Sequence, residues 1–518
     1  MPGNTIICPY CFRDFKDEEV HFRMETVYSE EDLDPKGEHR SREEIEMDVR
    51  FSSAEIKAQI AEYEHREKFV KHDDEKYEAF WAEFGGTTEK SSVSRDGKAP
   101  SVMPYQRAVF DPRDPNHAKY FSQPKRESDV INESGMVYAA YDCFGKETQR
   151  RVCPHCHNPL PGAYGKYPVK FISVIGISGA GKTVYLSQLC KYIAKQISYF
   201  DITANPTSIY AKEYLEANPV VMGKGLPIGT PPEQLLQPLC FDLIYRRDNR
   251  EHCHTIVFYD IAGENCVDHE RIRGFGRFVE HSDGIILLID PDQFNEATNK
   301  AQPVLVLQTI YNLFQNKGRE EVRNLPIAVC ISKGDKIAME MMQQNLDDIH
   351  ILQDNSGAFL PRFNAEDYNS VHDAIKSFVQ RNDNELHISL RTLYDNYNYF
   401  LFSAIGTSVQ KIEGTELDTP AGPPIPKRIM EPVVWLLYQY RFIASQGTIH
   451  EPKDWICNGC GKRRRVHNKY CPDCKTNNNG EWECPRCKTV QTGEWCTTPK
   501  CKTNRFGKRR GLFSKKIK

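Results

Sequence analysis

The chain has 518 residues and a formal net charge of −3, with 39% hydrophobic and 27% charged residues. This composition is typical of a soluble protein with at least one full core, and the length allows about three domains. No apolar run approaches the roughly 20 residues needed to cross a bilayer, and the first residues lack the apolar stretch of a signal peptide. We therefore expect a cytoplasmic protein with no membrane partner.

Charge and cysteine are distributed unevenly along the chain. Residues 14–90 hold 24 acidic and 12 basic residues, whereas residues 453–518 hold 18 basic and 5 acidic residues. Of the 18 cysteines, ten form five C-x-x-C pairs and two form a C-x4-C pair. In a reducing cytosol, paired cysteines at these spacings are more often metal ligands than disulfides, so the sequence predicts Zn²⁺.

The first two cysteine pairs, Cys8 with Cys11 and Cys153 with Cys156, are separated by 141 residues. Each C-P-x-C knuckle presents two thiolates to one side, and two knuckles complete a tetrahedral zinc site. We predict a zinc ribbon split between residues 1–12 and 150–165. Two unrelated reduced pairs are the alternative, and two neighbouring histidines are alternative ligands: His155 and His157.

Residues 13–149 form an insertion between the halves of this ribbon. Apolar residues recur every seven positions and predict one narrow stripe along a charged helical segment: Val49, Ile56, Tyr63, Val70, Tyr77 and Phe84. The stripe indicates either a partner-binding helix or, as we prefer, a helix that packs against the main domain. From 85 to about 128, glycine, proline, serine and charged residues predict a poorly ordered loop.

Residues 169–183 (VKFISVIGISGAGKT) read as a buried strand that leads into a phosphate-binding loop and a helix. In G-x-x-x-x-G-K-[ST], glycines let backbone N–H groups wrap round a phosphate, Lys182 reaches the β and γ oxygens, and the Thr183 hydroxyl is a ligand of Mg²⁺. A glycine-rich turn that binds nothing is the alternative. The predicted nucleotide-binding residues of this loop are Gly176, Ser178, Gly179, Ala180, Gly181, Lys182 and Thr183.

A second apolar run, 255–260, ends in D-x-x-G. Here Asp260 is predicted to hold Mg²⁺, and the amide of Gly263 to contact the γ-phosphate. Thr230 is our candidate for a further Mg²⁺ ligand. It lies after Thr183 in the sequence and before another strand-like run, 239–245.

Two more apolar runs, 282–291 and 326–335, are predicted strands, and the second ends in S-K-G-D. A carboxylate at Asp335 can accept from both N1–H and the 2-amino group of guanine, which adenine does not offer in that arrangement. Ser332 begins the motif, and the stem of Lys333 would cover the face of the base. A last predicted strand, 399–402, leads into two residues whose backbone would meet guanine O6: Ser403 and Ala404.

In this order, the four motifs resemble the Ras-like P-loop GTPases of the translation-factor-related class. The segments FYDIAGE, SDGIILLIDPDQF and EPVVWLL are similar to the bacterial double-GTPase families, which are often found in conflict-system gene neighbourhoods. The resemblance covers about 168–445 and implies an α/β fold with a mostly parallel sheet, placed here at 166–448. It also implies Mg²⁺-dependent hydrolysis of GTP to GDP, with Lys182 as a catalytic residue.

One departure from the Ras-like pattern concerns the residue after D-x-x-G. Ras-like enzymes have a water-orienting glutamine there, whereas this chain has Glu264. Either Glu264 is catalytic and hydrolysis is slow or depends on a partner, or Glu264 points away and plays no part.

The C-terminal part is predicted to contain two zinc ribbons, 453–478 and 480–503, followed by a basic tail, 504–518. With few apolar residues there, zinc would supply most of the folding free energy. The predicted ligands are Cys457, Cys460, Cys471 and Cys474 in the first ribbon, and Cys484, Cys487, Cys496 and Cys501 in the second.

The motifs together predict a GTP-hydrolysing switch whose zinc ribbons dock a protein partner, with a role in bacterial defence or conflict. Two alternatives remain open at this point. One is a zinc protein that binds nucleic acid through its basic C-terminal tail and is regulated by GTP. The other is an ATP-using P-loop enzyme in which S-K-G-D is coincidental.

Overall fold

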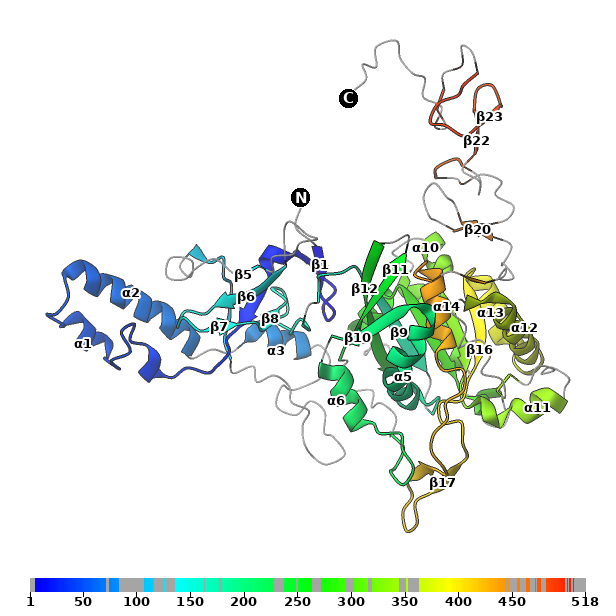
Figure 1. Cartoon of the computed structure of the whole chain (residues 1–518), viewed down its shortest axis with the longest axis horizontal. Helices are drawn as coiled ribbons and strands as arrows, with labels where there is room; N and C mark the ends of the chain where they lie inside the picture. Colours follow the sequence, from blue (N-terminus) through cyan, green and yellow to red (C-terminus); the bar gives the residue numbers. More distant parts are fainter. Residues whose placement is uncertain are drawn as a thin grey trace. The chain divides into compact units, whose positions relative to one another are not determined.

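Figure 1 shows the whole chain as a computed structural model. Contacts divide it into two compact units, Met1–Ala444 and Ser445–Lys518. The structure describes residues 5–70, 74–82, 107–115, 125–126, 136–162, 164–176, 179–207, 209–227, 237–247, 250–262, 272–294, 302–314, 319–343, 351–352, 363–443, 445–446, 454–456, 463–465, 471, 473–476, 481–498, 501, 503–504 and 506.

A seven-stranded sheet forms the centre of the first unit, in the order β10-β11-β12-β9-β13-β14-β16. The five strands from β12 to β16 run parallel, and β10 and β11 pair antiparallel at one edge. The fold is therefore α/β with a mostly parallel sheet, as the sequence predicts. The strands are β9 (Val169–Gly176), β10 (Ile202–Pro206), β11 (Leu239–Arg247), β12 (Arg250–Ala262), β13 (Gly284–Ile289), β14 (Ile327–Ile331) and β16 (Tyr397–Leu401).

Helices cover both faces of this sheet, which is why its central strands are apolar along their whole length. Alternate strand residues join one core with α8, α9, α12 and α13. On the other face, α5 packs against β9 and β12, and α14 packs against β14. The helices of this part are α5 (Lys182–Ile197), α6 (Ile209–Ala217), α8 (Ile272–Glu280), α9 (Gln302–Leu313), α10 (Arg319–Asn324), α11 (Ala338–Gln343), α12 (Ala365–Asn382), α13 (Asn384–Leu393) and α14 (Glu431–Gln439).

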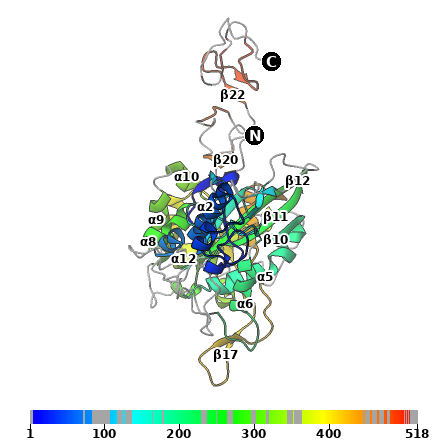
Figure 2. The ribbon, with the colours of Figure 1, turned by 90° about the vertical axis from the view of Figure 1, so that its left-hand side faces the viewer.

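The N-terminal lobe contains small sheets as well as helices. β1 pairs with β2, β3 lies between β4 and β8, and β6 lies between β5 and β7. In Figure 2, which faces this lobe, α2 lies in front of the central sheet. Its elements are β1 (Thr5–Ile7), β2 (Asp14–Lys16), β3 (His21–Arg23), α1 (Arg42–Glu46), α2 (Ser53–Val70), α3 (Glu75–Ala82), β4 (Val109–Phe110), β5 (Lys125–Arg126), β6 (Val137–Tyr141), β7 (Glu147–Thr148) and β8 (Arg151–Val152).

The predicted seven-residue stripe does not form the buried face of α2. Val49 precedes the helix and is 97% exposed, whereas the side chains that α2 buries are Gln59, His65 and Arg66. Polar partners replace apolar packing here, since Arg66 donates to the carbonyl oxygens of Asp34 and Cys143. Most of the predicted loop at 85–128 lies outside the described residues, and its described part, 107–115, contains β4.

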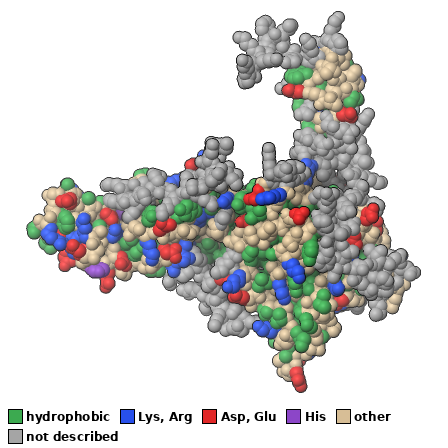
Figure 3. Space-filling view, viewed as in Figure 1, with side chains coloured by type: hydrophobic (Ala, Val, Ile, Leu, Met, Phe, Trp, Pro, Cys, Tyr) green, Lys and Arg blue, Asp and Glu red, His purple; other side chains and the backbone are tan. Residues whose placement is uncertain are grey.

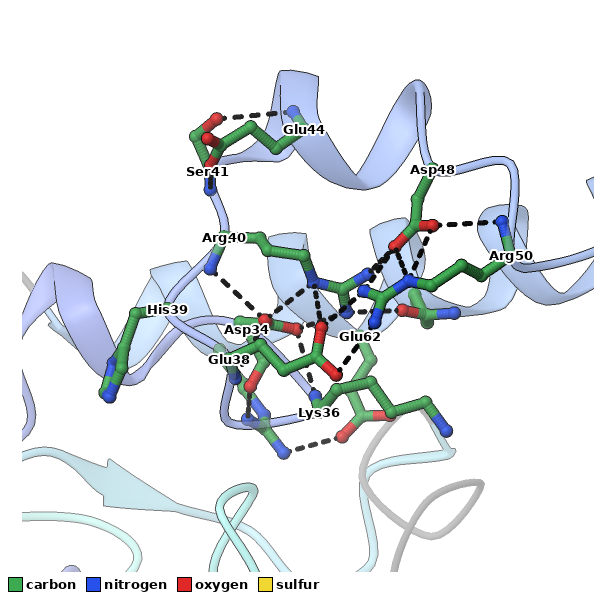
Figure 4. Close-up of polar contacts among 12 residues, drawn as sticks. Asp34, Lys36, Glu38, His39, Arg40, Ser41, Glu44, Asp48, Arg50 and Glu62 are labelled. Atoms are coloured by element: carbon green, nitrogen blue, oxygen red, sulfur yellow. Dashed lines mark hydrogen bonds and ion pairs between the residues drawn. The ribbon is translucent and has the colours of Figure 1, made fainter.

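Ion pairs hold the segment around α1. The buried carboxylate of Asp34 accepts from Nε and Nη2 of Arg40, each at 2.9 Å, and Arg40 also pairs with Asp48 (Figure 4). Burial alone would raise the pKa of Asp34, but hydrogen bonds from Arg40 and from backbone N–H groups hold it at about 2. Lys and Arg side chains alternate with Asp and Glu side chains over the surface of α1 and α2 (Figure 3), so the acidic excess of this lobe is partly compensated locally.

The second unit contains two short antiparallel pairs, β20 with β21 and β22 with β23. None of the helices in the described part of the chain is long and apolar enough to cross a membrane. The strands are β20 (Asp454–Ile456), β21 (Arg463–Arg465), β22 (Trp482–Glu483) and β23 (Val490–Gln491).

Just before α14, Arg428 lies between the carboxylates of Glu431, which is buried, and Asp367 of α12. Arg428 Nη1 lies 2.6 Å from Glu431 Oε1 and 2.9 Å from Asp367 Oδ2, so two carboxylates share one guanidinium group. Glu431 is 1% exposed. Burial raises the pKa of Glu431 to about 8; the charge of Arg428 opposes this shift and that of Asp367 adds to it.

This shift predicts a pH-dependent contribution to stability. Because the pKa of Glu431 in the folded chain exceeds its ordinary value of 4.5, the folded state binds this proton more tightly than the unfolded state. The stabilisation is full below pH 4.5 and is lost as the pH rises to about 8. We expect Glu431→Gln to gain stability relative to wild type between about pH 5 and pH 8, by a few kcal/mol at most. Urea unfolding at several pH values measures this difference, and a difference that does not change with pH contradicts the assignment.

Candidate functional site

The predicted phosphate-binding loop lies between the end of β9 and the start of α5. Gly176 has no room for a side chain, because an added Cβ would lie 2.8 Å from Lys182 Cγ and 3.0 Å from Leu288 Cβ. Gly179 and Gly181 have φ angles of +84° and +75°, which residues with a side chain rarely adopt. Glycine at these positions therefore lets the backbone turn tightly in front of the N-terminus of α5, where N–H groups favour an anion.

Thr183 and Asp260 meet at the sheet edge beside this loop. Asp260 lies near the end of β12, in register with Val174 of the neighbouring β9. The Thr183 hydroxyl lies 3.5 Å from Asp260 Oδ2. Two oxygens on one octahedral Mg²⁺ ion at about 2.1 Å are ~3 Å apart when adjacent, so this pair fits Mg²⁺ either directly or through a water ligand.

The predicted base-binding motif follows β14. Lys333 adopts a left-handed conformation with φ of 49°, and the Ser332 hydroxyl donates to the carbonyl oxygen of Ile289 at 3.1 Å. Ser403 joins the motif from the end of β16, since its hydroxyl donates to Asp335 Oδ1 at 2.5 Å. The S-K-G-D and S-A motifs are thus held together by a direct hydrogen bond.

The two ends of the predicted site face a single cavity of about 280 Å³. This volume is near the lower end of the range for small-molecule pockets. Lys182 is buried at 6% exposure and is not itself in the cavity wall. The lining residues are Ala180, Gly181, Val184, Leu226, Ser332, Lys333, Asp335, Lys336, Phe402, Ser403, Ala404, Ile405, Thr407, Val409 and Asp418.

Four residues of the predicted nucleotide site have no described position. Nothing in the structure therefore bears on their predicted contacts with phosphate, Mg²⁺ or water. They are Ser178, Thr230, Gly263 and Glu264.

Asp290 is a site residue that the sequence analysis missed. It follows β13 directly, is 6% exposed, and accepts from Lys333 Nζ at 2.7 Å. Its Oδ2 lies 3.6 Å from where a Cβ on Gly179 would be, and Lys333 Cε lies 4.0 Å from the corresponding point on Gly181. Asp290 therefore holds the lysine of the base motif against the phosphate-binding loop. A polar residue directly after a buried strand was the available signal.

A second missed residue is Tyr214 on α6. Its hydroxyl donates to Asp260 Oδ2 at 2.9 Å, the same oxygen that Thr183 approaches. No motif marks this tyrosine in the sequence.

The four cysteines of the predicted split ribbon come together despite their separation. All four sulfurs lie within 4.8 Å of one another, with Cys8 3.7 Å from Cys156 and Cys11 3.8 Å from Cys153. Four sulfurs at about 2.3 Å from one zinc ion are ~3.8 Å apart, so the donor set fits a tetrahedral Zn²⁺ site.

The two candidate histidine ligands have other partners. His155 Nε2 lies 3.3 Å from the carbonyl oxygen of Asp14, and His157 Nδ1 lies 2.6 Å from Asp74 Oδ1. The geometry therefore favours the four thiolates.

In the second unit, the four cysteines of the last predicted ribbon also cluster. Their sulfurs lie within 4.8 Å of one another, including pairs at 3.4 Å, and Trp482 packs beside them at 1% exposure. Of the other predicted ribbon, Cys471 and Cys474 are buried in one small cluster. Their predicted partners lie outside the described residues: Cys457 and Cys460.

The first cysteine knuckle packs directly on the central domain. Phe12 stacks on His281 with ring centres 4.5 Å apart and meets Phe278 of α8 edge-on at 5.2 Å. The hydroxyl of Tyr259, the residue before Asp260 in the sequence, donates to the carbonyl oxygen of Pro9 at 2.6 Å. The knuckle therefore contacts both elements that flank the D-x-x-G segment.

Comparisons with known proteins agree with this geometry. Residues 170–386 match the family model Double-GTPase 2. A curated relative, the putative ESX-1 scaffolding and assembly protein SaeC of Mycolicibacterium smegmatis, is 24% identical over 169 residues. The match covers 31% of this chain and 43% of that protein, so the chain spans less than half the length of its relative.

The cysteine geometry predicts the metal content of the full chain. Because three cysteine sets are predicted, metal analysis should find about three zinc ions per chain, and Cys156→Ser or Cys484→Ser should each remove about one. Cys253→Ser, a change at a half-buried strand cysteine outside these sets, should leave the zinc content unchanged. Fewer than two zinc ions in the wild type, or an unchanged content in both ligand variants, contradicts the assignment.

The pair of Asp290 and Lys333 predicts a binding defect. Asp290→Asn keeps the shape but removes the charge that holds Lys333, so we expect about tenfold weaker binding of a fluorescent GDP analogue. Asp283→Asn is the matched control, since Asp283 pairs with Lys170 at the same distance of 2.7 Å and neither residue lines the cavity. Equal affinities of wild type and Asp290→Asn in fluorescence titrations would refute this role.

Proposed function

We propose that this chain, which carries a Double-GTPase 2 domain at residues 170–386, binds GTP with Mg²⁺, hydrolyses it to GDP and phosphate, and acts as a nucleotide-dependent switch. One observation carries the proposal: the phosphate-binding loop and the S-K-G-D motif line the same cavity. A guanine nucleotide has a base at one end and phosphates at the other. A protein that binds it must therefore place base-binding and phosphate-binding residues no further apart than the length of the nucleotide.

Each residue in this proposal has a chemical role. Backbone N–H groups of the loop and the ammonium of Lys182 bind the β and γ phosphates, while Thr183 and Asp260 hold Mg²⁺. Bound Mg²⁺ would supply positive charge against the phosphate oxygens. Asp335 accepts from the two donors on the edge of guanine. Glu264 remains our candidate for the residue beside the attacking water, and its carboxylate can accept a proton but cannot donate as an amide does.

We also propose that the output is a protein interaction, made through the zinc ribbons. The curated relative is described as a putative scaffolding and assembly protein, which supports a protein partner rather than a small-molecule product. Bacterial conflict is the process that the resemblance to double-GTPase families implies. Clusters of reduced cysteines support a cytoplasmic location.

A nucleotide-binding panel tests the proposed function. Wild type should bind GTP and GDP at least about 100-fold more tightly than ATP, since a missing polar contact in a built site costs several kcal/mol. Asp335→Asn should lose binding of GTP and gain binding of xanthosine triphosphate, because the amide N–H of asparagine can donate to the 2-oxo group of xanthine. Equal wild-type affinities for ATP and GTP would rule out guanine recognition.

Two further measurements complete this test. Asp383→Asn is a matched control, because Asp383 caps α13 away from the cavity and asparagine is an equally good cap. Phosphate release from GTP should require Mg²⁺ and should be lost in Lys182→Ala. If the chain binds GTP but releases no phosphate, whether alone or with a partner protein added, then it is a GTP-binding protein and not a GTPase.

A further inference from the structure

Helix α6 lies between the strands β10 and β11 in the sequence. It packs against α5 and β11 (Figure 1). Its Tyr214 reaches the carboxylate that is proposed to hold Mg²⁺, with the hydroxyl 2.9 Å from Asp260 Oδ2. Thr183 of the phosphate-binding loop lies 3.5 Å from the same oxygen, so Tyr214 and Thr183 both approach Asp260 Oδ2.

The position of Tyr214 is fixed by the end of its own helix. Ser187 of α5 donates to the carbonyl oxygen of Asn218 at 2.7 Å, and Asn218 Nδ2 donates to the carbonyl oxygen of Tyr214 at 3.0 Å.

We propose that α6 supports the Mg²⁺ site of this protein: Tyr214 holds the Asp260 carboxylate in place for Mg²⁺. The proposal rests on the proposed GTP and Mg²⁺ binding. Tyr214 is a positioning residue, because it acts through Asp260 rather than on the nucleotide. A hydrogen bond that fixes a metal ligand raises affinity by reducing the ligand's freedom before the metal arrives.

The test measures Mg²⁺ affinity rather than turnover. Dissociation of a fluorescent GDP analogue from the full, zinc-loaded chain is followed over a range of Mg²⁺ concentrations. Tyr214→Phe should raise the Mg²⁺ concentration at half effect by about tenfold, the usual cost of losing a residue that supports a metal ligand. Binding of the analogue in EDTA should equal that of wild type. An unchanged or lowered half-effect concentration overturns the positioning role.

Tyr210→Phe is the matched control, since it removes the same group from the same helix one turn away. It should leave the half-effect Mg²⁺ concentration unchanged. A shift as large as that of Tyr214→Phe would mean that α6 is merely destabilised by either substitution, and this outcome overturns the specific role of Tyr214.

The two levels of proposal fail differently. A chain that binds no guanine nucleotide in EDTA or in Mg²⁺ overturns the proposed function and this inference with it. A chain that binds guanine nucleotides normally, with the same Mg²⁺ dependence in wild type and Tyr214→Phe, overturns this inference alone.

Discussion

The site depends on the register of the parallel strands. Gly176 at the end of β9 is level with Ala262 of β12 and Leu288 of β13, and Ile331 of β14 is level with Leu401 of β16. The segments that follow these strands therefore leave the sheet at one edge, where ligands of open α/β sheets bind. A slip of one residue in any strand would turn its side chains to the opposite face. Strand pairing, more than any single contact, places the phosphate and base motifs around one cavity.

The cysteine knuckles add a constraint over a long distance. Cys8 and Cys156 are 148 positions apart, and their contact closes a loop that contains the whole insertion. Closing a loop of this length costs conformational entropy that a few van der Waals contacts do not offset. Zn²⁺ bound by four thiolates would offset that cost, and it would fix both the start of the chain and the segment that leads into β9.

Strands and motifs could be predicted because their signals are local. A strand that is buried on both faces is apolar throughout, so 284–289 and 327–331 stand out in the sequence. Tyr214 could not be assigned this way, because its partner lies 46 positions away. Asp290 carries the local signal of a polar residue after a buried strand, but its pairing with Lys333, 43 positions away, could not be predicted. The helices of the insertion were predicted, but its strands were not, because strands of two to five residues carry too little periodicity. The buried face of α2 was also missed, because α2 buries polar side chains.

The packing of the first knuckle argues against an independently hinged zinc module. Phe12 belongs to the same continuous core as Phe278 and the inner faces of β12 and β13. A close-packed core has no spare volume, so a shift of α8 must displace the side chains that touch it or break their contacts. α8 follows the D-x-x-G segment, the part of a GTPase that moves with the γ-phosphate. A nucleotide-driven movement there would therefore reach the N-terminal lobe through Phe12, even without a change in the second unit.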